Sequence, residues 1–238
     1  MSPLPKADAN PAVLSEAPAH WEERSAQRVV EANRDQVLER SRRLVDAAYE
    51  LLESEGLEGL TIRAVLTRTG LARRAFYERF AGKDDLVLAV FEQTIRMASH
   101  SFAGLVEPVV DPMERLRLIV RSIVLGNDPS AAGAGASSNR RGAAMSREHL
   151  RLAESRPDEL QAAVGPLIAL LAAQLSAGMQ AGTVRRAEPQ RLATLLYNLV
   201  STTVHTELLA HETARPDPVR RTQLADDIWE FCRRAIAA

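Results

Sequence analysis

The sequence is poor in several residue types and patterns on which common classes of protein depend. Its 238 residues include one cysteine, Cys232, two lysines and 4% aromatic residues. A single cysteine excludes an intramolecular disulfide framework and any metal or redox motif built from several cysteines. We find no run of about 18 uncharged apolar residues, so no membrane span is expected. The N-terminus lacks the basic region and apolar stretch of a secretory signal. These absences favour a cytoplasmic protein.

Charge is nearly balanced along the whole chain. The 30 basic and 31 acidic residues leave a formal net charge of −1. This average gives no support for a nucleic-acid partner, although an average hides local patches. We interpret residues 1–34, which contain four prolines and balanced charges, as a flexible N-terminal arm with a short helix at about 21–32. A basic arm that binds nucleic acid is not supported.

The residues that are abundant favour helix. Hydrophobic residues make up 46% of the chain, and alanine, leucine, arginine and glutamate are preferred over the β-branched and aromatic residues of strands. Helical periodicity begins at Asp35. The sequence predicts an all-α fold, with a first helical domain at 35–83 and a second helical domain at 84–238. A segment rich in glycine, alanine and serine predicts a loop at about 126–142.

The segment 61–83 differs from the rest of the chain in charge and in its turn signals. Six basic residues in it oppose a single acid, Glu78, so its local net charge is +5. Thr61 is placed to cap one short helix and Gly70 to end it, and a second short helix is expected from about 72 to 79. These are the proportions of a helix-turn-helix, whose second helix enters the major groove of DNA. A solvated basic helix face is the alternative.

A longer series of motifs makes a resemblance specific. In order, the chain carries Ala47-Ala48, Gly56, Thr61-Ile62, Gly70, Phe76-Tyr77-Glu78-Arg79-Phe80 and Lys83-Asp84-Asp85-Leu86. Over residues 37–91 this order and spacing resembles the DNA-binding domain of TetR-family transcriptional regulators. Further along, Ala-Gly-Thr-Val-Arg-Arg at 181–186 and the apolar helix that begins at Pro189 are similar to the last third of the family's variable helical domain.

The resemblance implies roles for the residues of the expected DNA-binding face. Thr61 would cap its helix and offer its hydroxyl and backbone N–H to a phosphate, and Tyr77 and Lys83 resemble the family's phosphate-contacting tyrosine and lysine. Arg74 and Ala75 occupy positions that commonly meet base edges, where arginine binds guanine and alanine touches the thymine methyl. The expected DNA-binding residues are Thr61, Arg63, Arg73, Arg74, Ala75, Tyr77, Arg79 and Lys83.

Four residues depart from the family's pattern. Leu66 stands where a small alanine is usual between the two helices, and Thr69 replaces the alanine before the turn glycine. Ala72 replaces a common serine cap, a change worth about 1 kcal/mol of local stability. Arg74 is bulkier than the frequent glycine. The departures leave a rival interpretation: a helical ligand-binding or scaffold module whose altered helix-turn-helix has no specific DNA binding.

The resemblance also implies a small-molecule effector site within the helical domain that follows. The residues assigned to it are Met97, Phe102, Met113, Leu116, Val120, Ile123, Met145, His149 and His205. Ordinary helix core is the favoured interpretation of most of these apolar side chains, some of which would serve both purposes. The two histidines have the same alternative, as ordinary interior or surface residues.

Two later helices, at about 157–181 and 189–211, carry long apolar faces. The residues assigned to a dimer interface are Leu167, Leu171, Leu175, Leu192, Leu195, Leu199 and Thr203. By resemblance they would form a four-helix contact across a two-fold axis, and an intrachain core is the alternative. A homodimer would hold two recognition helices about 34 Å apart, or a multiple of that distance, and so read a palindromic operator in double-stranded DNA.

Nothing in the sequence supports catalysis. No two of the five histidines have the i, i+4 spacing of a helical metal site. Cys232 follows Phe231 on the last expected helix and is interpreted as a packed or interface thiol. We therefore expect no enzymatic activity, no metal and no cofactor. The expected function is that of a sequence-specific transcriptional regulator, by family frequency a repressor relieved by a small ligand.

Overall fold

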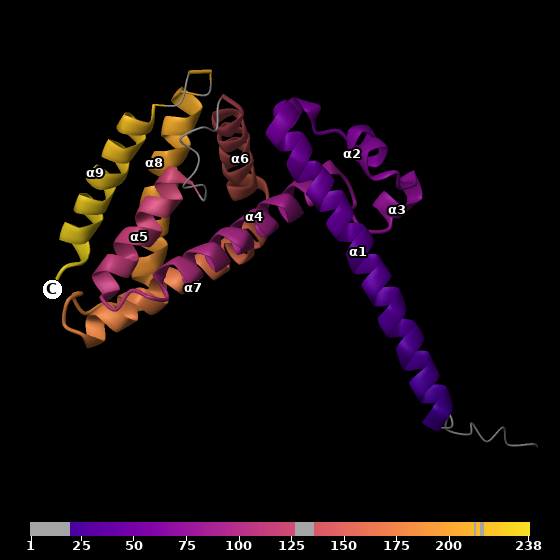
Figure 1. The fold of residues 1–238 in the computed structure, drawn as a ribbon, viewed down its shortest axis with the longest axis horizontal. Helices are drawn as coiled ribbons and strands as arrows, with labels where there is room; N and C mark the ends of the chain where they lie inside the picture. Colours follow the sequence, from indigo (N-terminus) through magenta and orange to yellow (C-terminus); the bar gives the residue numbers. More distant parts are fainter. Residues whose placement is uncertain (1–19, 127–135, 212, 215–216) are drawn as a thin grey trace, which may run out of the picture. The chain divides into compact units, whose positions relative to one another are not determined.

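The backbone is built from helices joined by short turns (Figure 1). A computed structural model describes residues 20–126, 136–211, 213–214 and 217–238. In chain order the elements are α1 (His20–Gly59), α2 (Ile62–Thr69), α3 (Arg73–Tyr77), α4 (Lys83–Val106), α5 (Pro112–Leu125), α6 (Ala136–Ser155), α7 (Pro157–Gln180), α8 (Pro189–Ala210) and α9 (Pro218–Ile236). Apart from an isolated bridge between Val184 and Ala237, these residues contain no β-structure. The expected all-α class is confirmed.

Helix α1 crosses the boundary between two units, which meet at Ser41 and Arg42. In the first unit, the described side chains between residues 33 and 40 are exposed. The short helix expected at about 21–32 is present as part of α1, which begins at His20, and residues 1–19 lie outside the described part. Composition explains why the helix continues without a break, because no proline occurs between Pro18 and Pro108 and residues 20–34 are rich in glutamate and arginine.

In the second unit, the end of α1 packs with α2, α3 and the start of α4 around one apolar core. Its largest fully buried side chains are Leu44, Leu52, Leu60, Phe76 and Leu86. Gly56, at φ 73°, interrupts the helical path of α1, as expected of a helix stop. Leu57 to Gly59 then lead to the second helix.

The other helices of this unit share a second core. Helix α7 packs against α4, α5, α6 and α8, and α9 packs against α5. The side chain of Asp111 accepts a hydrogen bond from the Met113 N–H at 3.0 Å and so caps α5 ahead of Pro112, as the Asp-Pro pair predicts. Cys232 is fully buried in this core, and burial raises the pKa of its thiol to about 11.

The loop expected at about 126–142 is shorter than the sequence suggests. Helix α6 begins at Ala136, so residues 136–142 are helical, and residues 127–135 lie outside the described part. Glycine is needed at position 142 for packing and not to form a loop, because a Cβ added there would come within 3.0 Å of the Leu208 side chain. A glycine that lets α6 approach α8 looks the same in sequence as a linker glycine.

Among the described residues one helix, α7, has the length and apolar composition to cross a membrane. Its glutamines interrupt the apolar residues, so this helix contains no unbroken apolar run of about 18 residues although its mean hydropathy is high. One helix of this kind is weak evidence for a span, because the core helix of a globular domain passes the same test. Leu167, Leu171 and Leu175 are at most 2% exposed within the second core, so α7 is packed here as a core helix.

Candidate functional site

The turn between α2 and α3 is built from local hydrogen bonds. The Thr61 hydroxyl accepts a bond from the Ala64 N–H at 3.1 Å and caps α2, as expected. Gly70 takes a left-handed conformation, φ 67°, and its N–H donates to the Leu66 carbonyl at 2.9 Å. Ala72 offers no side-chain cap to α3. The two helices therefore keep the expected helix-turn-helix order despite the weak second cap.

Helix α3 presents three polar side chains to solvent. Arg74 has a side chain 90% exposed, and its Nε donates to Glu78 Oε1 at 2.8 Å. That bond is the main reason why the pKa of Glu78 lies below its ordinary value. The Arg73 guanidinium lies 5.5 Å from the centre of the Tyr77 ring, which is itself exposed. Phe76, between them in sequence, is fully buried and anchors the helix.

Two residues of the expected DNA-binding face lie differently from the expectation. The Arg79 side chain is only 6% exposed, and one of its Nη atoms donates to the Ala75 carbonyl, so it does not reach outward. Its Nε is buried without a hydrogen-bond partner in the described residues. Lys83 is half-buried, and its Nζ donates to the Leu57 carbonyl at 3.2 Å. Both cations therefore bind the domain's own backbone.

The remaining residues of this face are open or half-open. Thr61 and Arg63 are exposed, and Ala75 is half-buried.

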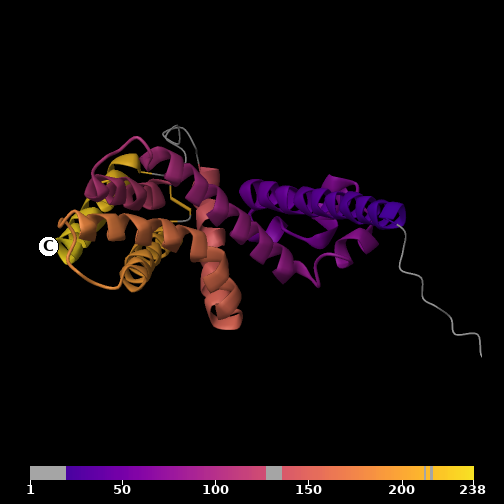
Figure 2. The same cartoon turned by 90° about the horizontal axis from the view of Figure 1, so that it is seen from below.

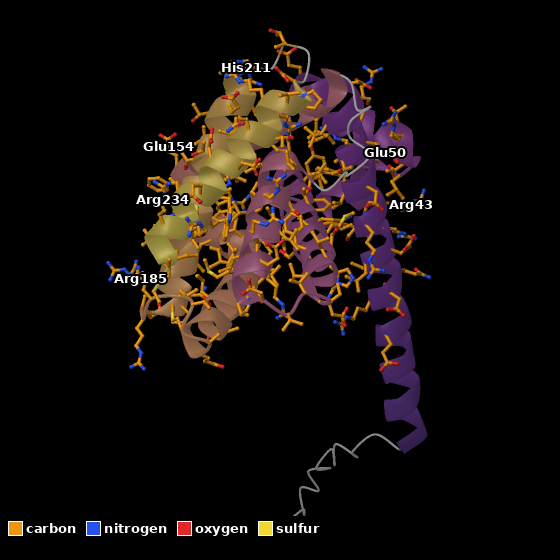
Figure 3. All side chains as sticks on the ribbon, turned by 60° about the vertical axis from the view of Figure 1, so that its left-hand side comes forward. Arg43, Glu50, Glu154, Arg185, His211 and Arg234 are labelled. Atoms are coloured by element: carbon orange, nitrogen blue, oxygen red, sulfur yellow. The ribbon has the colours of Figure 1, made fainter. Side chains whose placement is uncertain are left out.

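Sequence reasoning missed Arg43, whose Nη2 donates to the Thr69 carbonyl at 2.7 Å and so connects α1 to the end of α2. Arg43 and Glu50 both project from α1 (Figure 3). No motif marks an arginine that binds a backbone carbonyl 26 residues away.

A cavity of about 280 Å³ lies among α4, α5, α6, α7 and α8. Of the nine residues expected to form an effector site, Phe102, Ile123, Met145 and His205 line it. The others do not: Met97 is 58% exposed, Leu116 and Val120 are buried in the core, and Met113 packs against that core. Apolar periodicity marked the helix faces correctly but could not separate the cavity wall from the solid core behind it.

His149 does not line the cavity but packs against residues that do. Its ring lies 4.5 Å from the His205 ring and 5.5 Å from the Phe91 ring, centre to centre. Burial lowers the pKa of both imidazoles, to about 4 for His205, where His149 adds a smaller effect. Both rings are therefore neutral near pH 7. Within the described residues, no three histidine, cysteine, aspartate or glutamate side chains are placed to hold a metal ion.

Comparison with known proteins finds a family model that matches the helix-turn-helix segment. Residues 44–90, from α1 into α4, match the model of the bacterial regulatory proteins of the tetR family. This segment of the chain is therefore a domain of the tetR-family type. The match covers α2, the Gly70 turn and α3, so the exposed Arg73, Arg74 and Tyr77 belong to a tetR-type helix-turn-helix. No curated protein matches the chain.

Solved structures extend the likeness to most of the chain. A putative TetR-family transcriptional regulator from Mesorhizobium loti is 16% identical with a TM-score of 0.61, over 85% of this chain and 98% of its own. FadR from Bacillus subtilis, in complex with stearoyl-CoA, is 14% identical with a TM-score of 0.62, over 80% and 96%. RolR, in complex with resorcinol, is 15% identical with a TM-score of 0.62, over 85% and 89%. At these identities the likeness shows a shared fold.

The tetR-family domain is joined to the later helices by two ion pairs at the start of α4. Arg151 of α6 lies 3.1 Å from Asp84, and Arg156, which precedes α7, lies 2.6 Å from Asp85. Asp85 also accepts the Ala81 N–H at 2.8 Å. That bond first, and Arg156 next, hold the pKa of Asp85 below its ordinary value. Figure 2 shows α6 running across α4, and the two helices are in contact.

The residues expected at a dimer interface separate into two groups. Leu167, Leu171, Leu175 and Leu192 are at most 6% exposed in the intrachain core, so the alternative interpretation holds for them. Leu167 also lines the cavity. On α8, Leu195 is 58% and Leu199 38% exposed, and Thr203 is half-buried. Their spacing of four residues places these three on one stripe of the helix.

Proposed function

We propose that this chain is a sequence-specific repressor of transcription, which binds a palindromic operator in cytoplasmic DNA as a homodimer and is released by a small ligand. The observation that carries the proposal is the exposure of Arg73, Arg74 and Tyr77 on α3, directly after the Gly70 turn. A short helix with outward arginines and a buried aromatic anchor is suited to the major groove.

Arg74 is the residue best placed to read a base. Its bond to Glu78 joins two side chains that are 90% and 47% exposed. Exposed pairs of this kind are weak, so the guanidinium exchanges Glu78 for a guanine edge at little cost. Thr61, Arg63 and Arg73 then supply phosphate or base contacts around it. Lys83, Ala75 and Tyr77 complete the proposed set, and Arg79 acts from inside as a support.

The proposed two-fold contact uses the exposed stripe of α8, formed by Leu195, Leu199 and Thr203. In a two-fold contact the same patch meets its own copy, so a short apolar stripe becomes a continuous one. The buried leucines of α7 hold this helix from behind. Pairing of two chains supplies the second recognition helix that a palindrome requires.

The proposed response to a ligand uses helices that touch both the cavity and the tetR-type domain. Residues of α4 and α6 line the cavity, and the ion pairs of Asp84 and Asp85 connect α4 to α6 and α7. A ligand that binds one arrangement of these helices more tightly shifts the start of α4 and lowers operator affinity. The complexes of FadR with stearoyl-CoA and of RolR with resorcinol support a small-molecule ligand for this chain.

The test is selection of bound fragments from genomic DNA by the purified chain, followed by affinity measurements on the selected site. Arg74→Ala is expected to lower affinity by about tenfold and to relax preference at one base pair. Arg234→Ala is the matched control, because Arg234 makes a similar helical pair with Glu230 at 2.7 Å on α9, outside the helix-turn-helix (Figure 3). Selection of no common sequence would overturn the proposal and favour the scaffold interpretation.

A further inference from the structure

The wall of the cavity is apolar and has one polar end. Its apolar surface comes from α4, α7 and α8, through Phe91, Ile95, Phe102, Leu167 and Val204. Among the lining side chains that the structure describes, none is an aspartate, glutamate, lysine or arginine. Removing an unpaired charge from water is strongly unfavourable. This wall therefore disfavours both an anionic and a cationic occupant.

The histidine pair forms the polar end. His205 lines the cavity, and the ring of His149 lies behind it at 4.5 Å between centres. His149 Nδ1 is buried and has no hydrogen-bond partner within the described residues. A neutral imidazole has one donor and one acceptor nitrogen. This end of the cavity can therefore either donate or accept a hydrogen bond while it remains uncharged.

Three hydroxyl groups of the wall donate hydrogen bonds to backbone carbonyls. Thr94 donates to the Val90 carbonyl and Ser146 to the Gly142 carbonyl, each at 2.8 Å. Ser201 donates to the Asn198 carbonyl at 3.4 Å. Their protons are used within their own helices, and His205 is the one lining side chain among the described residues that has an imidazole to offer.

The volume limits the size of an occupant. Small-molecule pockets measure about 300–1,000 Å³, and this cavity of about 280 Å³ lies just below that range. A nucleotide or a coenzyme A thioester would need both more room and cations for its phosphates. The aromatic faces of Phe91, Phe102 and Tyr197 suit a flat ring.

We propose that the cavity binds a small, uncharged, mainly apolar molecule of one or two rings, whose single hydroxyl group exchanges a hydrogen bond with His205. The inference rests on the proposed function only for the claim that this molecule is the effector. Binding itself is measured on the full chain without DNA, so its failure and the failure of operator binding are separate results.

Four probes of one shape distinguish the ligand classes: 2-naphthol, naphthalene, 2-naphthoate and 2-naphthylmethylammonium. Titration calorimetry near neutral pH is expected to show binding of 2-naphthol. Naphthalene should bind about tenfold more weakly, because the imidazole loses its partner. The anion and the cation should each bind at least about tenfold more weakly than 2-naphthol. Equal or tighter binding of either ion would overturn the proposal, as would no binding of 2-naphthol at about 1 mM.

Three variants locate the binding. Ala98→Phe places a ring in the cavity and should abolish binding of 2-naphthol, whereas Ala153→Phe, at an exposed site of α6, should leave it unchanged. His205→Phe should equalise the affinities for 2-naphthol and naphthalene. Circular dichroism checks the fold, and Ile123→Phe replaces Ala98→Phe if that variant unfolds. Unchanged binding by the folded cavity-filling variant would overturn the site.

Discussion

At the scale of single residues, the position of Arg79 predicts that it supports α3 and does not read DNA. Its side chain is 6% exposed and donates to the Ala75 carbonyl. Arg79→Ala removes this packing and bond, so we expect the free energy of unfolding to fall by about 1–2 kcal/mol. Urea denaturation measures this change. DNA affinity should fall evenly across sequences, because the orientation of α3 is lost and no base contact is removed.

Arg74→Ala is the comparison for this prediction. It removes a side chain that is 90% exposed, so stability should change by less than about 0.5 kcal/mol while base preference relaxes. A loss of stability in the Arg74 variant, with an unchanged Arg79 variant, would reverse the two assignments.

The sequence could predict the identity of these residues but not their direction. Six cations in 23 residues marked a basic segment, and the motifs marked it as a helix-turn-helix. Periodicity cannot tell that Arg79 turns back onto α3, nor that Lys83 reaches the Leu57 carbonyl, because each depends on a neighbour's backbone. For the same reason, the sequence could not predict that Arg43 donates a hydrogen bond to the Thr69 carbonyl.

At the scale of elements, the ion pair between Arg156 and Asp85 joins the start of α4 to α7. Arg156→Gln and Asp85→Asn each remove it, and we expect each to lower operator affinity by about three- to tenfold without touching DNA. The double variant should be no worse than either single one, because both break the same link. Fluorescence anisotropy with the selected operator measures the DNA affinity of the natural chain, the two single variants and the double variant.

The control for this cycle is Arg233→Gln, which breaks a helical pair with Glu230 on α9 at 2.8 Å. It should leave operator affinity unchanged. Strict additivity of the Arg156 and Asp85 effects would argue against a shared link and leave the coupling to the packing of α4 alone.

Element boundaries were predictable where a cap or a glycine defines them. Thr61, Gly70 and Asp111 act as their types suggest, through a side-chain acceptor or a left-handed turn. The full lengths of α1 and α6 were not predictable, because helix-favouring residues extend both helices beyond the last clear signal in the sequence. Gly142 shows the general difficulty: its role depends on Leu208, which is 66 residues away in the sequence.

At the scale of the whole molecule, the stripe of Leu195 and Leu199 predicts the oligomeric state. Leu199→Arg places a charge against its own copy across a two-fold axis, so we expect the dimer to separate. Light scattering after size exclusion should show the mass falling from about twice 26.1 kDa to 26.1 kDa. Leu150→Arg, on the exposed face of α6, should leave the dimer intact. A dimeric Leu199 variant would place the contact elsewhere.

The histidine pair gives the stability of the whole molecule a defined dependence on pH. Burial lowers the pKa of His205 from 6.5 to about 4, so the folded chain holds this ring neutral where the unfolded chain protonates it. The stabilisation is complete above pH 6.5 and is lost as the pH falls from there toward 4. Its full loss amounts to about 3 kcal/mol, which urea denaturation between pH 7 and 4 measures.

The pH window separates this effect from that of the carboxylates. Asp85 has a pKa below its ordinary 3.8, so its contribution is lost only when the pH falls below about 4. His205→Phe removes the group that titrates higher, and the stability of this variant should vary less than that of the natural chain between pH 6.5 and 4. Burial also lowers the pKa of His149, so the His205→Phe variant should keep part of the pH dependence of stability. Adding His149→Phe should remove that remaining part. Identical slopes in the natural chain and the double variant would mean that neither ring is held neutral by the fold, and the polar end of the cavity would then carry charge.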